Sequence, residues 1–232
     1  MINGKTVLAV IPARGGSKRL HRKNVLSLAG KSLIIWTIEA AIKSKYIDKI
    51  IVSSEDKEIL KISLEAGAEI IKRPQELATD EASTFSVVND VISRMESQFD
   101  YVTLLQPTSP LRNNEHVDES FDLLVGKNAD AVISVCETVH SPLWANTLPE
   151  DGSMENFLND GIINKRSQDI EKYYRLNGAI YISRIEKFLN ESTFFLKKNI
   201  YSYEMDINAS IDVDTIIDFE LCKILMALSR TD

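Results

Sequence analysis

The stretch "VLAVIPARGGSKRLHRKN", residues 7–24, contains both the feature that decides the fold and the feature that suggests a site. It begins with five consecutive apolar residues, and an uninterrupted apolar run is typical of a strand buried on both faces of a parallel sheet. The run stops at Pro12, and the twelve residues after it include five Lys or Arg and one His but no acid. The chain as a whole has a formal net charge of −7, so this basic loop requires a specific explanation.

Beyond this strand, strand-like and helix-like segments alternate along the chain. Apolar β-rich runs predict strands at 6–11, 49–54, 68–73, 101–106, 130–137, 178–183 and 200–205. Helical periodicity predicts helices at 32–45, 56–67, 82–95, 116–127 and 214–230. Ser32 can cap the first of these helices, and Gly67 can end the second. The alternation indicates an α/β fold in which helices cover both faces of a mostly parallel sheet.

The composition limits the class of protein. A length of 232 residues suits one α/β domain, so we expect residues 1–232 to form a single domain. The isoelectric point near 5.1 argues against nucleic acid as a partner. No apolar run is long enough to cross a bilayer, and the N-terminus does not resemble a signal peptide. Cys136 and Cys222 lie far apart in apolar contexts and are interpreted as buried free thiols of a reducing, cytoplasmic compartment.

The regular alternation breaks near residue 138. The segment that follows mixes turn-forming residues with aromatic and aliphatic ones, and it is too long for an ordinary connection inside a compact domain. We therefore interpret residues 138–175 as an arm that packs against another subunit.

Parallel α/β sheets bind ligands beyond the carboxyl ends of their strands. Polar residues follow four of the predicted strands, at Arg14, at 53–56, at 73–80 and at 106–112. In the first of these loops, backbone N–H groups of the glycine turn can surround phosphate oxygens, and Arg14 and Lys23 can neutralise them. The loop matches neither GxGxxG nor GxxxxGK[ST], and from composition alone it could equally be a solvated basic loop.

A second candidate site is "SIDVDT", residues 210–215. Asp212 and Asp214 are two positions apart in an extended segment, so both carboxylates should point to the same side. Mg²⁺ is commonly held by one or two carboxylates together with substrate phosphates. The alternative is that Asp214 only caps the last predicted helix.

Taken together, the motifs resemble those of a known family. "IPARGGSKRLHRKN", "GKSLIIWTI", "RPQELATDEAST", "LLQPTSPLR", "NGAIYIS" and "SIDVDT" occur in the order found in the acylneuraminate cytidylyltransferases, the CMP-sialic acid synthetase family, which includes CMP-legionaminic acid synthetases. The resemblance extends from about residue 5 to the final helix. It favours the phosphate-site interpretation of the basic loop and the metal-site interpretation of the aspartate pair.

The resemblance implies a Rossmann-like nucleotidyltransferase fold with an inserted dimerisation arm, and a cytoplasmic homodimer. It also implies an enzyme that uses CTP and Mg²⁺, or Mn²⁺, to activate a nine-carbon keto-sugar acid of the sialic or legionaminic type. The products are a CMP-sugar, for lipopolysaccharide or capsule biosynthesis, and pyrophosphate. Neither nucleic acid nor membrane is an expected partner.

Roles for individual residues also follow from the resemblance. The residues implied at the nucleotide are Ala13, Arg14, Ser17, Lys23, Asn24 and Thr84. Those implied around the sugar are Gln106, Tyr181, Phe194, Phe195 and Arg175, the last supplied by the partner subunit. Asp212 and Asp214 match the metal-binding pair, and the residues expected to act in catalysis are Arg14, Lys23 and Asp214. Arg19, His21 and Arg22 are interpreted as solvated side chains.

Three alternative functions are considered at this point, and the identity of the general base is open. The sugar could be pseudaminate or another keto-sugar acid, because related enzymes share the basic loop, although "ELATDEAST" is closer to the sialate and legionaminate branch. A relative that binds CTP without turnover has little need of an aspartate pair. A dinucleotide-dependent oxidoreductase lacks support because GxGxxG is missing. The general base could be a metal-bound hydroxide, a water or an Asp.

Overall fold

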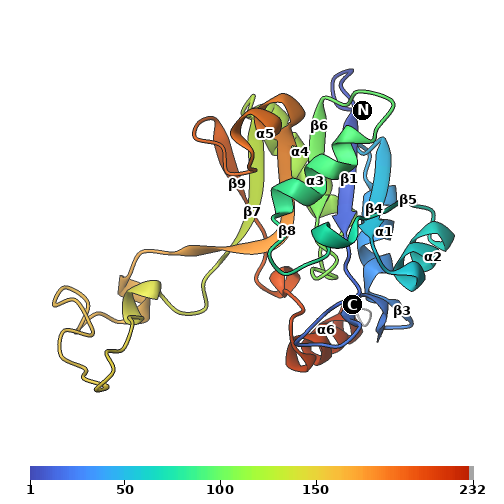
Figure 1. Ribbon diagram of the computed structural model, residues 1–232. Coiled ribbons are helices and arrows are strands. Elements are labelled where there is room, and N and C mark those ends of the chain that lie inside the picture. The colour runs from blue at the N-terminus through green and yellow to red at the C-terminus, as the bar shows by residue number, and fades with distance from the viewer. Residues whose placement is uncertain (230–232) are drawn as a thin grey trace.

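A seven-stranded sheet organises the computed structural model, which describes residues 1–229 (Figure 1). Across the sheet the strands are β5 (Glu69–Lys72), β4 (Lys49–Ser54), β1 (Val7–Pro12), β6 (Tyr101–Leu105), β8 (Tyr174–Arg184), β7 (Ala131–Glu137) and β9 (Ile200–Glu204). Strand β8 is antiparallel to β6 and β7, and the remaining pairs are parallel. The predicted, mostly parallel α/β sheet is thereby confirmed.

The apolar run in β1 explains why this strand lies inside the sheet. Val7, Ala9 and Ile11 belong to the core on one face, whereas Leu8 and Val10 belong to the core on the other. All five side chains are fully buried. A strand covered on both faces has no position for a polar side chain, so its sequence is apolar without alternation.

Helices cover both faces of the sheet (Figure 1). One face is covered by α1 (Leu33–Lys43), α2 (Lys57–Glu65) and α4 (Asn114–Gly126), and the other by α3 (Thr84–Ser93) and α5 (Ile185–Glu191). Gly67 follows α2 with φ +95°, as its predicted role as a helix end requires. The capping role predicted for Ser32 is wrong: it stands at the N-cap of α1, but its side chain accepts no capping hydrogen bond.

A third apolar cluster lies at the carboxyl ends of the parallel strands. Here α6 (Ile216–Leu228) packs against the short hairpin of β2 (Ser27–Leu28) and β3 (Lys31–Ser32). The predicted closing helix, 214–230, thus begins two residues later than expected, and its residue 230 lies outside the described part of the chain. Both cysteines are free and buried, as predicted.

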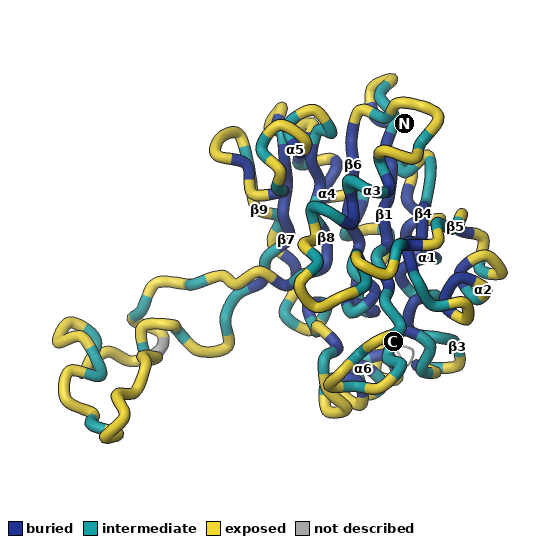
Figure 2. Tube along the Cα trace, in the orientation of Figure 1, coloured by how far each residue is buried: buried dark blue, intermediate teal, exposed yellow. Residues whose placement is uncertain are grey.

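The segment between β7 and β8 leaves the body of the molecule as a long excursion, drawn in yellow and light orange at the lower left of Figure 1. It contains two short 3-10 turns, at Pro142–Trp144 and Ser167–Asp169. Most of it is exposed (Figure 2), including the apolar side chains Val139, Leu148 and Met154. An excursion thus occupies most of the segment 138–175, and its last two residues, 174 and 175, already belong to β8. That the excursion packs against another subunit stays a prediction.

The helices of residues 1–229 are all too short or too polar to cross a membrane.

Candidate active site

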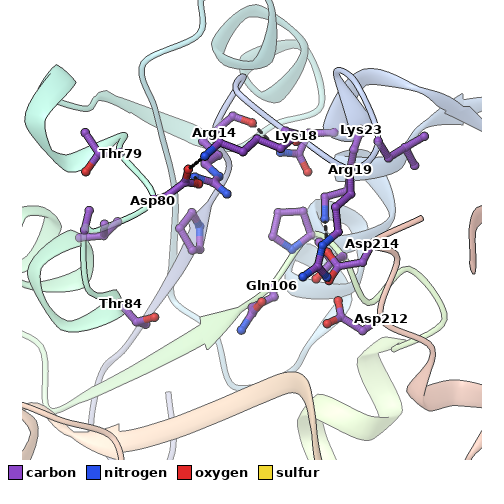
Figure 3. Close-up of a pocket in the computed structure, with 18 of the residues that line it drawn as sticks. Arg14, Lys18, Arg19, Lys23, Thr79, Asp80, Thr84, Gln106, Asp212 and Asp214 are labelled. Carbon is purple, nitrogen blue, oxygen red and sulfur yellow. Dashed lines mark hydrogen bonds and ion pairs between the residues drawn. The ribbon is translucent and has the colours of Figure 1, made fainter. Parts of the chain in front are cut away.

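A cavity of about 680 Å³ opens at the carboxyl ends of the parallel strands. Its walls come from the basic loop after β1, the segment from β5 into α3, the turn after β6, and the residues before α6. Three of these walls are loops in which the sequence places polar residues after a strand, and the fourth is the segment of Asp212 and Asp214. The remaining polar segment, 53–56, does not line this cavity. Figure 3 shows Gln106 between Thr84 on one side and the pair Asp212 and Asp214 on the other.

Lys23 and Arg19 both reach the second aspartate. Lys23 is largely buried, and its Nζ donates to the Val213 carbonyl at 2.7 Å and to Asp214 Oδ1 at 2.9 Å. Arg19 Nη1 donates to Asp214 Oδ2 at 2.8 Å. Arg19, expected only as a solvated side chain, therefore also lines the cavity.

Arg14 and Lys18 both pair with Asp80, which lies in the loop between β5 and α3 (Figure 3). Hydrogen bonds from Lys18 and then from Arg14 lower the pKa of the Asp80 carboxyl. Four of the five cations of the basic loop thus line one cavity. The fifth, Arg22, turns away and pairs with Asp56 at the start of α2. The loop is therefore a charged wall rather than a merely solvated surface.

The glycine turn of the basic loop differs from the expectation that its N–H groups are free for phosphate. Gly15 donates its N–H to Glu55 Oε1 at 2.7 Å. A Cβ at Gly15 would stand 2.6 Å from Asp56 Oδ2, so this glycine permits close packing against α2. Asn24 is buried and donates through Nδ2 to the Arg14 carbonyl at 2.9 Å, which fixes the course of the loop. Ala13 is also buried and packs into the core beneath the cavity.

Asp212 and Asp214 face the same cavity, as their spacing predicts. The capping alternative for Asp214 is wrong because Thr215 is the N-cap of α6 and forms a capping box with Asp218. Asp212 lines the cavity and is exposed there. Even so, partial desolvation of its carboxyl by the surrounding protein is the main cause that raises the pKa of that group. The neighbouring charge of Asp214 adds to that rise, whereas the Thr108 hydroxyl and Lys23 oppose it.

The aspartate pair fits a hard divalent cation. Two carboxylates one residue apart offer oxygen ligands, and their mutual repulsion would be relieved by a cation between them. Within residues 1–229, no group of three or more His, Cys, Asp or Glu is arranged to hold a metal. The remaining ligands would therefore have to come from a bound substrate or water.

A second cavity, of about 260 Å³, adjoins the first. Thr84, Leu104 and Gln106 line both cavities. The aromatic residues of the second cavity are Phe85, Tyr181, Phe188, Phe194 and Phe195. The Tyr181 ring lies 5.8 Å from that of Phe194 and 6.1 Å from that of Phe195, between centroids. Burial, and then the Asp212 charge, raises the pKa of Tyr181. Four of the five residues expected around the sugar therefore meet here.

The fifth, Arg175, lies where the arm joins the body and is not among the residues lining either cavity. Its Nη2 donates to the Ser210 carbonyl at 3.3 Å.

Arg73 lines the first cavity and was given no role by sequence reasoning. It is buried, and it donates to the Ser53 carbonyl at 2.6 Å and to Ser53 Oγ at 3.1 Å. Burial lowers the pKa of its guanidinium. Its place directly after β5 is the signal that could have singled it out.

Comparison with known proteins gives concordant results. A sequence model of the family described as "Cytidylyltransferase" matches residues 8–229. An N-acylneuraminate cytidylyltransferase of Streptococcus agalactiae serotype V is 39% identical over 91% of this chain and 51% of its own length, so the chain spans about half of that relative. A CMP-N,N′-diacetyllegionaminic acid synthase of Legionella pneumophila is 36% identical, with 97% of each chain covered.

Among solved structures, a CMP:2-keto-3-deoxy-manno-octonic acid synthetase complexed with CTP superposes with a TM-score of 0.69. It is 20% identical in sequence, and the match covers 97% of this chain and 99% of the other. The Rossmann-like architecture is thus shared with a known nucleotidyltransferase.

Proposed function

Since this chain belongs to the cytidylyltransferase family, we propose that it activates a nonulosonic acid of the sialic or legionaminic type with CTP. The products are a CMP-sugar and pyrophosphate. The observation that carries the proposal is the continuity of the two cavities. A wall of cations with an aspartate pair meets an aromatic cavity at Thr84 and Gln106. The names of the streptococcal and Legionella relatives support the same substrate class.

The first cavity is assigned to the nucleotide. Arg14, Lys18, Arg19 and Lys23 provide four positive charges for a triphosphate. Ser17 also lines this wall, and Thr84, at the other side, is assigned to the cytidine. The second cavity is assigned to the sugar acid, whose carbon skeleton would lie against Tyr181 and Phe194.

In this reaction the protein mainly positions the two substrates and neutralises phosphate charge, and it forms no covalent bond to either substrate. The anomeric hydroxyl oxygen of the sugar acid attacks the α-phosphorus of CTP and forms the new P–O bond. The bond from that phosphorus to the bridging oxygen breaks, pyrophosphate departs with the bond electrons, and the hydroxyl proton passes to a base. Lys23 and Arg14 stabilise the negative charge that accumulates on the phosphates.

Asp212 and Asp214 would hold Mg²⁺ or Mn²⁺. When bound, the cation supplies further neutralisation of phosphate charge. Lys23 and Arg19 hold Asp214 in place from the side of the basic loop.

We also propose that the protein acts as a cytoplasmic homodimer in which Arg175 approaches the partner's sugar. The exposed apolar side chains of the arm support an intersubunit contact. The location of Arg175 at the base of this arm, outside its own chain's two cavities, agrees with action in the neighbouring site.

Pyrophosphate release tests the proposal when each of the four NTPs is combined with a panel of sialic, legionaminic and pseudaminic acids. Release is expected with CTP and a sialic or legionaminic acid. Release with ATP but not CTP would overturn the nucleotide assignment, and release with pseudaminic acid alone would overturn the sugar assignment. Absence of release from every combination would overturn the enzyme assignment.

A further inference from the structure

Three polar side chains are buried next to the start of the segment that carries Asp212 and Asp214. Ser134 belongs to β7, Asn177 to β8, and Ser210 to the 3-10 turn Asn208–Ser210. Their exposed fractions are 1%, 1% and 0%. Buried polar groups destabilise a core unless hydrogen bonds satisfy them, so an arrangement of three requires a reason.

The three side chains form one hydrogen-bonded chain. Ser134 Oγ donates to Asn177 Oδ1 at 2.6 Å and accepts from the Ile180 N–H at 2.8 Å. Asn177 Nδ2 donates to Ser210 Oγ at 2.9 Å. Ser210 Oγ in turn donates to the Asp206 carbonyl at 2.8 Å. Asn177 therefore ties the sheet to the segment that continues to Asp212.

The network coincides with an irregularity in the sheet. Ile133 pairs with Tyr181, but Val135 pairs with Leu176, so β8 bulges between these two pairs. Gly178, in this bulge, has φ +76°. A Cβ on Gly178 would lie 3.8 Å from Gln106 Nε2 and 3.9 Å from Asp212 Oδ2.

The bulge thus lies beside both Gln106 and Asp212, with room between them for little more than a Cβ. Asn177 Oδ1 also accepts from the Ala179 N–H at 3.2 Å, which fixes the backbone on the far side of Gly178. The segment carrying Asp212 is attached elsewhere through the Val213 N–H, which donates to the Thr108 carbonyl at 2.8 Å.

We propose that Asn177 is a positioning residue that sets the distance between the Asp212 carboxylate and Gln106. This inference rests on the proposed function of the two cavities. The Asn177 amide holds Ser210 on one side and shapes the Gly178 bulge on the other. Loss of this link frees the Asp212 segment to move away from Gln106, without removing any group that contacts a substrate.

The test measures binding of Mn²⁺ by electron paramagnetic resonance, with CTP present and the sugar absent so that no turnover occurs. Ser210→Ala and Asn177→Ala are each expected to weaken Mn²⁺ binding by about three- to tenfold. This is at or below the lower end of the effect of removing an outer-shell partner of a metal ligand, because the two residues act on Asp212 through its backbone segment. Binding of CTP without metal should change by less than about twofold in both variants. In the double variant the loss should equal that of Asn177→Ala alone, because Asn177→Ala already breaks the link that Ser210→Ala removes.

Ser120→Ala is the matched control. Its hydroxyl is also fully buried and donates to the His116 carbonyl at 2.7 Å, within α4 and away from both cavities. This variant should lose stability but keep the wild-type affinity for Mn²⁺. Amide hydrogen exchange should accelerate over residues 206–214 in the two network variants and remain unchanged there in the control.

Wild-type affinity for Mn²⁺ in Ser210→Ala would overturn the inference, and this variant decides the test if Asn177→Ala does not fold. An equal loss in Ser120→Ala would overturn it as well, because the effect would then be general loosening of the core. Failure of the wild-type protein to bind Mn²⁺ with CTP would instead overturn the proposed metal site, and the inference with it.

Discussion

Gly15 and Gly16 are adjacent in the basic loop, yet they have different surroundings. A Cβ at Gly15 would come within 2.6 Å of Asp56 Oδ2, whereas a Cβ at Gly16 would have nothing within 4 Å. Gly15→Ala is therefore expected to displace the loop at a cost of about 1–3 kcal/mol and to raise the KM for CTP about tenfold. Gly16→Ala should leave both quantities near their wild-type values. Chemical denaturation and steady-state kinetics of the two variants measure the difference, and equal behaviour would contradict it.

Asp214 is the residue on which the proposed metal and the basic loop converge. Asp214→Asn keeps the shape of the side chain but removes the charge that Lys23 and Arg19 contact. We expect kcat to fall about 100-fold or more while the circular dichroism spectrum is retained. Glu220→Gln, an exposed acid of α6 that pairs with Lys223, should remain fully active. Full activity of Asp214→Asn would exclude a catalytic role for this carboxylate.

For individual residues, the sequence predicts which residue types line the site better than it predicts the contacts between their side chains. Lys23, Gln106 and Asp212 line the first cavity, as their motifs suggest. Arg73 and Asp80 stand at the two ends of the polar segment 73–80, but no individual role is predicted for either. The role of Asp80 depends on charges brought from another loop. Only the folded chain places Asp80 against Arg14, which is 66 positions away in sequence.

At the scale of a single element, helix α4 has an N-terminal cap whose stability depends on pH. His116 Nδ1 accepts from the Asn113 N–H at 3.1 Å, and Asn113 Oδ1 accepts from the His116 N–H, so the imidazole must be neutral for the capping box to form. Burial is the main cause that lowers the pKa of His116, and the charge of Arg112 lowers it further, although Glu119 opposes the shift. Below its ordinary pKa of 6.5 the unfolded chain binds a proton that the folded chain excludes, so stability is lost as the pH falls.

We therefore expect the free energy of unfolding to decrease by about 1 kcal/mol from this cap as the pH is lowered below 6.5. Urea denaturation at several pH values measures the slope. His116→Gln retains an acceptor at this position and should flatten the slope, whereas His140→Gln, on the exposed arm, should not. A slope in His116→Gln equal to that of the wild type would show that other groups cause the loss.

The elements themselves were predictable wherever the local pattern is strong. Strand β4 has the predicted bounds, and β1, β5 and β6 agree within a residue at each end. The antiparallel direction of β8 and its early start at Tyr174 were not predicted, because direction depends on partners distant in sequence. The two-turn helix α5 and the hairpin of β2 and β3 were also missed, since each is too short for a periodic pattern.

At the scale of the whole molecule, the arm suggests that each active site of a homodimer is completed by a residue of the partner subunit. If Arg175 acts in the partner's site, Arg175→Ala and Asp214→Asn should each be inactive as homodimers. After mixing and exchange of subunits, half of the dimers are mixed and one of their two sites is intact. About a quarter of the wild-type activity should therefore return.

A mixture of Lys23→Ala with Asp214→Asn is the control for this prediction. Both residues serve the cavity of their own chain, so no mixed dimer gains an intact site and activity should stay low. Equal activity in the two mixtures would contradict the assignment of Arg175 to the partner's sugar.

The four cations of the cavity wall are paired with two carboxylates: Asp80 with Arg14 and Lys18, and Asp214 with Lys23 and Arg19. Entry of a nucleotide is then an ion exchange, as on a charged resin, in which one anion replaces another. Such a surface selects by valence, because a triphosphate can outcompete carboxylates that a singly charged phosphodiester cannot. The phosphate of the CMP-sugar is such a singly charged phosphodiester, so Asp80 and Asp214 can displace it from the cations, and the exchange that admits CTP also favours release of the CMP-sugar.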